Sequence, residues 1–257
     1  MPEFDLSNTT LIAFTVLAAA GLVHGVLGMG FPMVATPLLA LQGDLRQAVI
    51  ATLLPTIAVN LVNIARGGSW THSIGTHWPL VLLVPVGTVL GTLLLVSFDP
   101  VPLQLLLAAV IVLYLIQGYL PTGLFSWVGR RPKLAYGIFG LGAGLLAGSV
   151  NVMVPLLVIL CLELSMGKLV MIQVLNLCFL TGKLVQMATL AALGTVGVTD
   201  LAVYLPHTAV ALAALWLGFR LRDRLDAASY LRWVRRALAL MALALTIRAV
   251  LALSTAA

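Results

Sequence analysis

Polar side chains that could bind an ion lie along one face of an apolar segment, residues 169–192. A helix over this segment would carry the polar stripe Gln173, Asn176, Lys183 and Gln186, separated by three, seven and three residues. These spacings follow the helical repeat of about 3.6 residues per turn, so the four side chains share one face. Lys183 lies close to the middle of the segment. An ammonium group there needs a counter-charge or a cavity, because burying an unpaired charge in apolar surroundings is costly.

The function of this stripe depends on which group balances the charge of Lys183. The neighbouring apolar segments contain no carboxylate at matching depth, so a bound anion is the simplest partner. The alternative is a lysine close enough to one end of its helix to extend its ammonium group to water.

A second polar stripe lies on residues 47–65 and contains the neutral side chains Thr52, Thr56, Asn60 and Asn63, followed by Arg66. Taken singly, each of these groups could hydrogen-bond to a neighbouring helix. Taken together, as a stripe facing Lys183, they would line the same cavity.

The composition places both stripes in a membrane. Of 257 residues, 61% are hydrophobic, and only 9% are charged, with 14 Lys and Arg against 8 Asp and Glu. Soluble domains usually have about 25% charged residues, so this chain could not cover a water-soluble surface. The composition therefore argues against soluble enzymes, DNA-binding proteins and secreted disulfide scaffolds. The two cysteines, Cys161 and Cys178, lie in apolar stretches without a CxxC motif or a histidine partner, which argues against a disulfide or a metal site.

The apolar runs are continuous, which predicts an all-α polytopic membrane protein rather than a barrel of alternating strands. Uninterrupted candidate spans cover residues 47–65, 78–97, 101–120, 169–192, 200–219 and 236–253. Two further regions are interrupted: 10–41, with a break at 28–32, and 134–162, with a break at 148–151. Glycine frees the backbone and proline removes a hydrogen-bond donor, so both breaks are plausible helix interruptions. Before the first region, Ser7-Asn8-Thr9 predicts a helix cap.

The two interrupted regions indicate an internal repeat. The first reads Gly21-x-x-x-Gly25-x-x-Gly28 before its break and Pro37-Leu38-Leu39 after it. The second reads Gly140-x-x-x-Gly144-x-x-Ala147, and Pro155-Leu156-Leu157 follows 118 residues after the first copy. Each copy precedes one long helix and two more spans. We therefore expect a single membrane domain of two similar halves, residues 1–128 and 129–257.

Charge predicts how the halves are oriented. The basic segments 130–133 and 220–236 should both be cytoplasmic. Three apolar segments lie between these two basic segments. Three full crossings would place the two basic segments on opposite sides of the membrane. We therefore expect the second interrupted region, with pieces of 14 and 11 residues over 134–147 and 152–162, to enter and leave on one side. If the first region does the same, each half has three crossings and the repeats are inverted, as in secondary transporters. If 10–28 spans by itself, the chain crosses seven times from an inside N-terminus.

A helix that restarts at membrane depth directs free N–H groups and the positive end of its dipole at its surroundings. Two converging restarts would favour an anion at the midplane; the alternative is that the glycines only allow close packing. The predicted substrate-binding residues are Gly28, Gly30, Pro32, Thr36, Thr52, Asn60, Gly148, Ser149, Asn151, Gln173, Asn176 and Lys183. His24 is a candidate for proton coupling, or a buried histidine satisfied by a backbone carbonyl. Arg248 extends to the membrane surface or faces a neighbouring helix.

The glycine and proline pattern from Gly21 to Pro37-Leu38-Leu39, with its weaker repeat from Gly140, resembles the TauE/SafE family of sulfite exporters. Length, the two halves and the hydropathy pattern are also similar, so the resemblance covers essentially the whole chain. Phe31-Pro32 stands where the family usually has further small residues. The resemblance implies a bacterial inner-membrane transporter that moves sulfite, sulfonates or related organosulfur anions.

The leading hypothesis is a secondary transporter of a small oxyanion, whose two halves rock about the central site. No GxxxxGK[ST] motif is present, and we expect no cofactor, metal ion or nucleic-acid partner. One alternative is an intramembrane enzyme, although the chain lacks a deep carboxylate pair. Another is an accessory membrane subunit, although the loops are short. The partners we expect are the anion, lipid and, through glycine-rich faces, a second copy of the chain.

Overall fold

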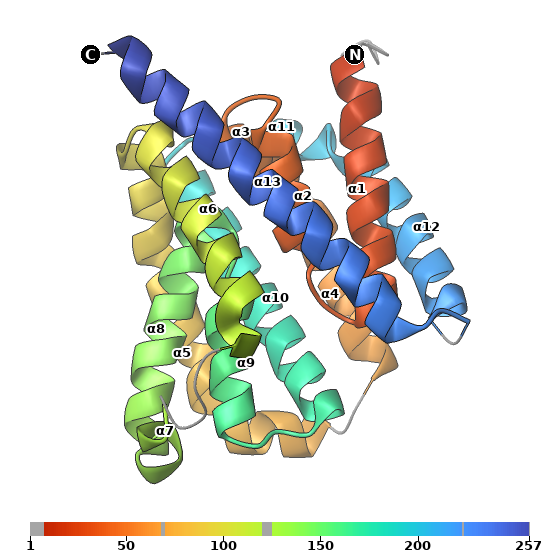
Figure 1. Ribbon diagram of the computed structural model, residues 1–257, viewed down its shortest axis with the longest axis vertical. Coiled ribbons are helices and arrows are strands. Elements are labelled where there is room, and N and C mark those ends of the chain that lie inside the picture. Colours follow the sequence, from red (N-terminus) through yellow and green to blue (C-terminus); the bar gives the residue numbers. More distant parts are fainter. Residues whose placement is uncertain (1–7, 68–69, 120–124, 223, 257) are drawn as a thin grey trace.

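The computed structural model describes residues 8–67, 70–119, 125–222 and 224–256, and over these residues the chain forms helices and no strand (Figure 1). The α-helices are α1 (Asn8–Leu27), α2 (Phe31–Ala40), α3 (Leu45–Ala51), α4 (Leu53–Arg66), α5 (Trp70–Ser97), α6 (Pro100–Ile116), α7 (Trp127–Arg130), α8 (Pro132–Val150), α9 (Val154–Glu163), α10 (Lys168–Ala192), α11 (Val198–Ala202), α12 (Leu205–Leu221) and α13 (Ala227–Ala256). A 3-10 turn, η1 (Gln117–Tyr119), follows α6. Ser7 of the predicted cap lies outside the described residues.

The lengths and apolar composition of these helices are those of a polytopic membrane protein. Within the described residues, four segments are long and apolar enough to cross a membrane: Thr10–Leu27, Gly75–Ser97, Pro132–Val150 and Lys168–Ala192. Helices α3 and α4 together form a fifth candidate, bent by 42° at Thr52. The prediction of an all-α membrane protein is therefore confirmed.

Both predicted helix breaks are present. The first separates α1 from α2, and Gly28 (φ +82°) and Gly30 (φ +97°) adopt the left-handed backbone that glycine accepts without steric cost. The second separates α8 from α9 at Asn151 (φ +62°), and asparagine tolerates this conformation better than most residues. Pro32 and Pro155 lie in the first turns of the restarted helices, where the missing N–H of proline breaks no hydrogen bond.

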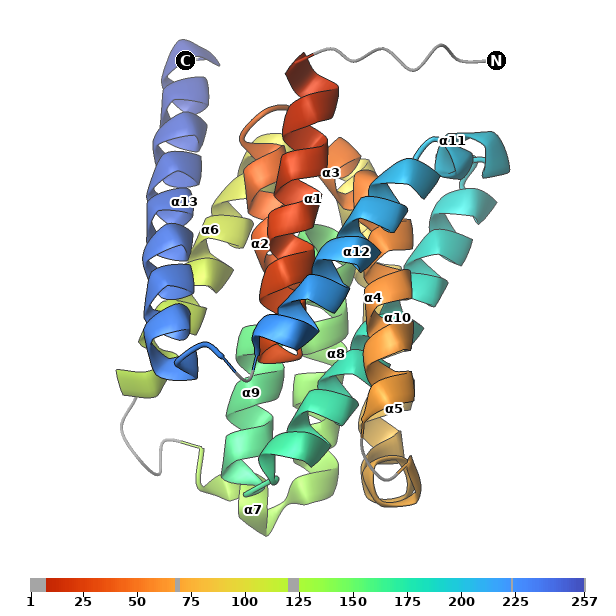
Figure 2. The same ribbon diagram turned by 90° about the vertical axis from the view of Figure 1, so that its right-hand side faces the viewer.

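Each broken region forms a hairpin with one long and one short helix. In Figure 2, α1 runs inward from one end of the molecule and α2 returns to that end, whereas α8 and α9 do the same from the α7 end. Helix α1 begins and α13 ends at the same end of the molecule, opposite α7 (Figures 1 and 2). Arg130 in α7 therefore lies at the end remote from the start of α1.

The expectation that both pieces of the second broken region are too short to span is wrong. Helix α8 has 19 residues and is long enough to cross a membrane, whereas α9 has only 10. The helix continues through Gly148 to Val150, and Asn151 follows as its C-terminal cap. The reason is tertiary: Gly148 packs on helix α5, where an added Cβ would lie 2.3 Å from the carbonyl oxygen of Thr88.

Two of the expected uninterrupted spans are interrupted. Residues 47–65 divide into α3 and α4 at Thr52, because Pro55 has no N–H to continue the hydrogen-bond ladder across the bend. Residues 200–219 divide into α11 and α12, and Pro206 again lies in the first turn of the second helix. Helix α5 also kinks at His77, just before the expected span 78–97. Pro55 and Pro206 thus mark helix starts that hydropathy alone does not show.

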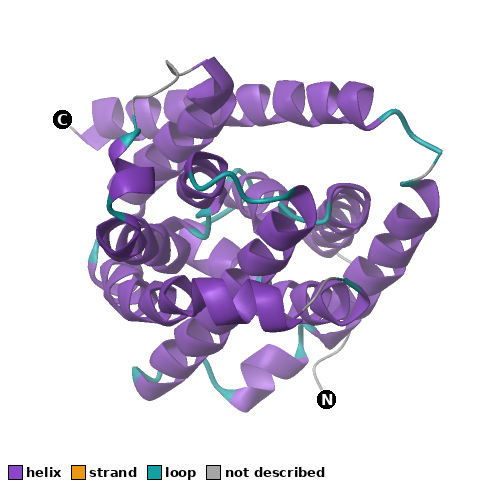
Figure 3. Cartoon of the chain, turned by 90° about the horizontal axis from the view of Figure 1, so that it is seen from below, coloured by secondary structure: helices purple, strands orange, loops and turns teal. Residues whose placement is uncertain are grey.

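Glycine-lined faces bring the backbones of two helix pairs close together. Helix α1 packs on α12 and α8 packs on α5, so each pair joins one helix from residues 1–128 with one from 129–257. A Cβ at Gly25 would lie 2.3 Å from the Leu215 carbonyl oxygen, and one at Gly144 would lie 2.1 Å from that of Val84. Helix α10 packs on both α4 and α5, and α6 packs on α13. Seen from below, helices surround the centre of the molecule, where loops are visible (Figure 3).

Candidate functional site

The predicted site residues lie in two hydrogen-bonded clusters, each at the tip of one hairpin. We call the first the Gly28 cluster: His24, Gly28, Asn63 and Asn176. The carbonyl oxygen of Gly28 accepts hydrogen bonds from Asn63 Nδ2 (2.6 Å) and from Asn176 Nδ2 (2.8 Å). Because Gly28 stands in the helix break, its carbonyl has no partner within a helix, and the two amides supply one.

His24 joins this hairpin tip to helix α10. Its Nδ1 accepts a hydrogen bond from the Phe31 N–H at 3.3 Å, and its Nε2 lies 3.1 Å from Asn176 Oδ1. A neutral imidazole has one donor and one acceptor, so these contacts assign the proton to Nε2. The side chain is 1% exposed. His24 is thus a satisfied buried histidine, but its partners are a backbone N–H and a side-chain amide, and not a backbone carbonyl.

The second group, the Asn151 cluster, consists of Thr36, Thr52 and Asn151. Asn151 Nδ2 donates to Thr36 Oγ1 at 2.7 Å and to Thr52 Oγ1 at 2.8 Å. These side chains are fully buried and come from α2, from the bend between α3 and α4, and from the tip of the α8–α9 hairpin. The cluster therefore connects one hairpin to the other.

Lys183 lies beside the α8–α9 hairpin and is 2% exposed. Its ammonium group donates to Gln186 Oε1, and Gln186 Nε2 donates to the Gly148 carbonyl oxygen at 2.8 Å. Among the described residues, no carboxylate forms an ion pair with Lys183. The expectation of a buried lysine without a protein counter-charge thus agrees with the described contacts, and a lysine that extends to the surface does not.

The remaining predicted residues make mostly local contacts. Ser149 Oγ donates to the Leu145 carbonyl oxygen at 2.7 Å, and Asn60 Nδ2 donates to that of Thr56 at 2.7 Å. Asn60 Oδ1 is buried and has no hydrogen-bond partner among the described residues. An added Cβ at Gly30 would meet no atom within 4 Å, so open space adjoins this position.

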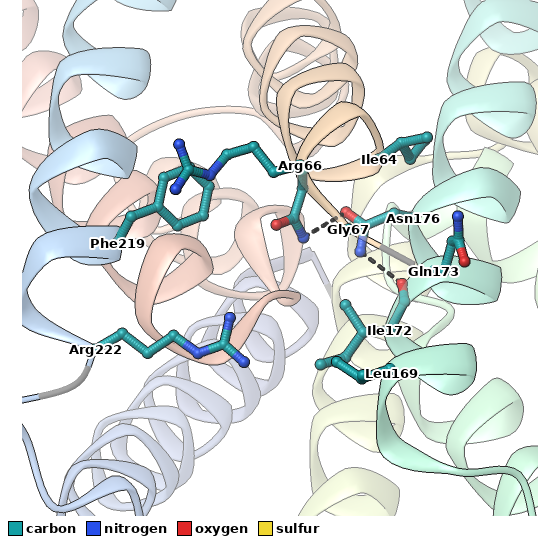
Figure 4. Close-up of a pocket in the computed structure, with 10 residues that line it drawn as sticks. Ile64, Arg66, Gly67, Leu169, Ile172, Gln173, Asn176, Phe219 and Arg222 are labelled. Carbon is teal, nitrogen blue, oxygen red and sulfur yellow. Dashed lines mark hydrogen bonds between the residues drawn. The ribbon is translucent and has the colours of Figure 1, made fainter. Parts of the chain in front are cut away.

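A cavity of about 330 Å³ lies between α4, α10 and α12 (Figure 4). It is lined by Asn63, Ile64, Arg66, Gly67, Leu169, Ile172, Gln173, Asn176, Phe219 and Arg222. Of the predicted site residues, Gln173 and Asn176 line it, whereas Lys183 does not. The structure therefore divides the predicted single site into a cavity beside the Gly28 cluster and a buried position at Lys183.

Sequence reasoning did not assign Arg66 and Arg222 to a site. Arg222 looked like one of several basic residues in a loop, and Arg66 like the end of a polar stripe. The available signal was the basic charge of each arginine near a helix end, and for Arg222 the predicted cytoplasmic segment already explained that charge. Only the packing of α4 on α12 brings the two arginines to one cavity.

Arg248 faces a neighbouring helix. Its Nη1 donates to the Ala40 carbonyl oxygen at 2.7 Å, at the C-terminal end of α2. A cation there also stabilises the negative end of the helix dipole. The open question of Arg248 is thus answered by a contact between α13 and α2.

A comparison with known protein families gives a match that extends over nearly the whole chain. Residues 13–249 match the model of the family described as sulfite exporter TauE/SafE. The chain belongs to the TauE/SafE family. The resemblance carried by the two glycine and proline motifs is therefore confirmed. No curated protein and no solved structure matches the chain. Membership makes this TauE/SafE protein a membrane transporter, and the family implies an anionic substrate such as sulfite.

The described part of this TauE/SafE protein contains no group of three or more His, Cys, Asp or Glu side chains that could hold a metal ion. Cys161 and Cys178 are free, buried thiols.

Proposed function

We propose that this protein is a secondary transporter that exports sulfite, a sulfonate or a related small organosulfur anion by alternating access. We place it in the bacterial inner membrane. Family membership supports the transporter class, and the two arginines and the lysine described above support an anionic substrate.

The observation that carries the proposal is Lys183. It lies in a helix long enough to cross a membrane, is 2% exposed and has an amide as its partner. A lysine at the centre of a membrane helix costs about 2.5–3.5 kcal/mol on insertion scales. A transported anion that paired with the ammonium group would offset part of this cost each time it bound.

The substrate would lie between the two hairpin tips, where α2 and α9 begin. The N-terminal ends of these helices would hold the oxygens of the anion, and Lys183 would supply the counter-charge. Polar groups at the tips and on the two long helices would orient it: Thr36, Thr52, Asn60, Ser149, Asn151, Gln173 and Asn176. His24 is the candidate for proton coupling in this scheme, since it bridges α2 and α10.

We further propose that residues 1–128 and 129–257 are inverted repeats. The support is the arrangement of the hairpins, which enter from opposite ends, and the mirrored packing of α1 on α12 and α8 on α5. A two-fold relation between the halves would explain why each hairpin is bound both by a polar group of α10 and by a polar group of α4 or of the bend before α4.

The glycine contacts argue that the moving bodies are not the sequence halves. Helices α1 and α12 belong to different halves but touch backbone to backbone, and the same is true of α5 and α8. We propose one body of α1, α4 and α12 and another of α5, α8 and α10. The Gly28 and Asn151 clusters join the two bodies at either end of the contact between α4 and α10, so breaking one cluster at a time would open the central site to alternate sides.

The test is flux of sulfite and sulfonates in liposomes that contain only the purified protein. Lys183→Met should abolish anion flux, whereas Lys168→Met, an exposed lysine at the start of the same helix, should leave it unchanged. Unchanged flux in Lys183→Met would overturn the role of Lys183. Absence of flux for every anion tried, with folded protein, would overturn the transport proposal itself.

A further inference from the structure

We infer that the cavity lined by Arg66 and Arg222 is a second anion site, distinct from the position of Lys183. We call it the vestibule site. It would hold the sulfite or sulfonate oxyanion before the anion reaches the centre of the protein, and this inference rests on the proposed function.

Arg66 is held in place by aromatic rings. Its guanidinium carbon lies 4.8 Å from the ring centroid of Trp216 and 4.4 Å from that of Phe219, both on α12. Such stacking uses the face of the guanidinium group, whereas its N–H donors point outward in the plane of the group. The edge of Arg66 is therefore oriented and still able to bind two oxygens of one anion.

The charge of the vestibule is unbalanced. Its ten lining residues include two arginines and no acidic side chain. Figure 4 shows Arg66 lying across the Phe219 ring and Arg222, just after the end of α12, extending toward Leu169 and Ile172 of α10. Two guanidinium groups at one cavity favour a ligand with paired, negatively charged oxygens, which sulfite and sulfonate groups provide.

The vestibule is separated from Lys183 by the Gly28 cluster. Asn63 and Asn176 line the cavity, but their amide N–H groups already donate to the Gly28 carbonyl oxygen. Lys183 lies seven residues beyond Asn176 on α10, which corresponds to about 10 Å along a helix. An anion at the arginines therefore cannot contact Lys183 until this cluster opens, so the two sites should bind independently.

The experiment counts bound anions on the full-length protein in detergent, by equilibrium dialysis with radiolabelled sulfite. The wild-type protein should bind two sulfite ions per chain, and Lys183→Met should retain one. Arg66→Gln and Arg222→Gln should each lose the other. Arg66→Lys keeps the charge but not the two-oxygen geometry, and should weaken this site less than Arg66→Gln does. Arg220→Gln and Arg224→Gln, exposed basic residues outside the lining, are the matched controls and should bind as the wild type does.

Flux in liposomes separates capture from translocation. With sulfite supplied from the vestibule side, Arg66→Gln and Arg222→Gln should raise KM about tenfold, as expected for loss of a charge-assisted hydrogen bond, with kcat little changed.

Three outcomes would overturn the vestibule site: one sulfite per wild-type chain that is lost in Lys183→Met, no binding at all, or the same rise in KM in Arg220→Gln. If the vestibule fails but Lys183→Met abolishes flux, the proposed function stands without it. If both arginine variants lose binding while the wild type moves no anion, the site stands and the transport proposal fails.

Discussion

At the scale of the residue, Asn151 serves two purposes that can be tested separately. Its backbone turns the chain between α8 and α9 with φ +62°, and its side chain donates to Thr36 and Thr52. The residue thus ends one helix and connects two hairpins. Glycine meets the backbone requirement at the corresponding break, where Gly28 and Gly30 have positive φ, but glycine cannot make the side-chain contacts.

Replacing Asn151 by glycine or by alanine should separate these two roles. Asn151→Gly keeps the left-handed turn and loses two buried hydrogen bonds, which are worth about 0.5–1.5 kcal/mol each. Asn151→Ala loses the same bonds and adds a left-handed backbone penalty of about 1–2 kcal/mol. Unfolding in detergent should therefore show alanine as the less stable variant. Equal stabilities would mean that the backbone at this position relaxes.

At the scale of the element, glycine has different roles at different positions of one helix. On α8, Gly140, Gly144 and Gly148 face α5 at close range, whereas Gly137 has nothing within 4 Å of an added Cβ. The interpretation of the Gly-x-x-x-Gly motifs as packing residues is therefore right for their glycines within helices, while the breaks at Gly28 and Asn151 lie at or beyond the ends of the motifs.

Gly144→Ala and Gly137→Ala form a matched pair for this distinction. A Cβ added at Gly144 would lie 2.1 Å from the Val84 carbonyl oxygen, so α5 and α8 must separate in Gly144→Ala, and we expect a loss of about 1–3 kcal/mol. Gly137→Ala should be neutral or gain up to about 1 kcal/mol from helix propensity. Thermal unfolding of both variants in one detergent checks this. A stable Gly144→Ala variant would contradict backbone contact between the helices.

At the scale of the whole molecule, the proposed moving bodies can be tested by cross-linking. Two of the native contacts lie within a body. The ring centroids of Phe14 in α1 and His207 in α12 are 4.2 Å apart, and His77 Nδ1 in α5 lies 2.9 Å from the Tyr136 hydroxyl in α8. A third native contact joins the two bodies. It is the hydrogen bond that Asn63 Nδ2 donates to Asn176 Oδ1 at 3.1 Å, and both side chains line the cavity.

Pairs of cysteines at these positions, in a Cys161→Ala, Cys178→Ala background, should respond differently to a short, reducible thiol cross-linker. Cross-links at 14 and 207 or at 77 and 136 should leave anion flux within about twofold of the uncross-linked protein, because bodies that move as units tolerate them. A cross-link between 63 and 176 should stop the flux that the same double-cysteine variant shows before cross-linking, and reduction should restore the flux to that level. Loss of flux from the cross-links within bodies, reversed by reduction, would instead favour motion between the sequence halves.

The sequence by itself determined the class of the protein and much of its local structure. Low charge and long apolar runs require a helical membrane protein, since unpaired backbone groups are too costly in lipid. Local chemistry also located both helix breaks, because glycine and asparagine accept positive φ and proline starts helices. The buried state of Lys183 followed from its place in an apolar helix. The glycine and proline motifs were enough to identify the family.

Only the tertiary structure decided which helices meet. The glycine faces of α1 and α8 are alike in sequence, so nothing local shows that α1 selects α12 and α8 selects α5. That choice depends on backbone shapes brought together from distant parts of the chain. The same packing lengthens α8 past Gly148, separates the cavity from Lys183 by the Gly28 cluster, and brings Arg66 and Arg222 to one cavity. Periodicity shows which face of a helix is polar, but the partner of that face is set by contacts between segments remote in sequence.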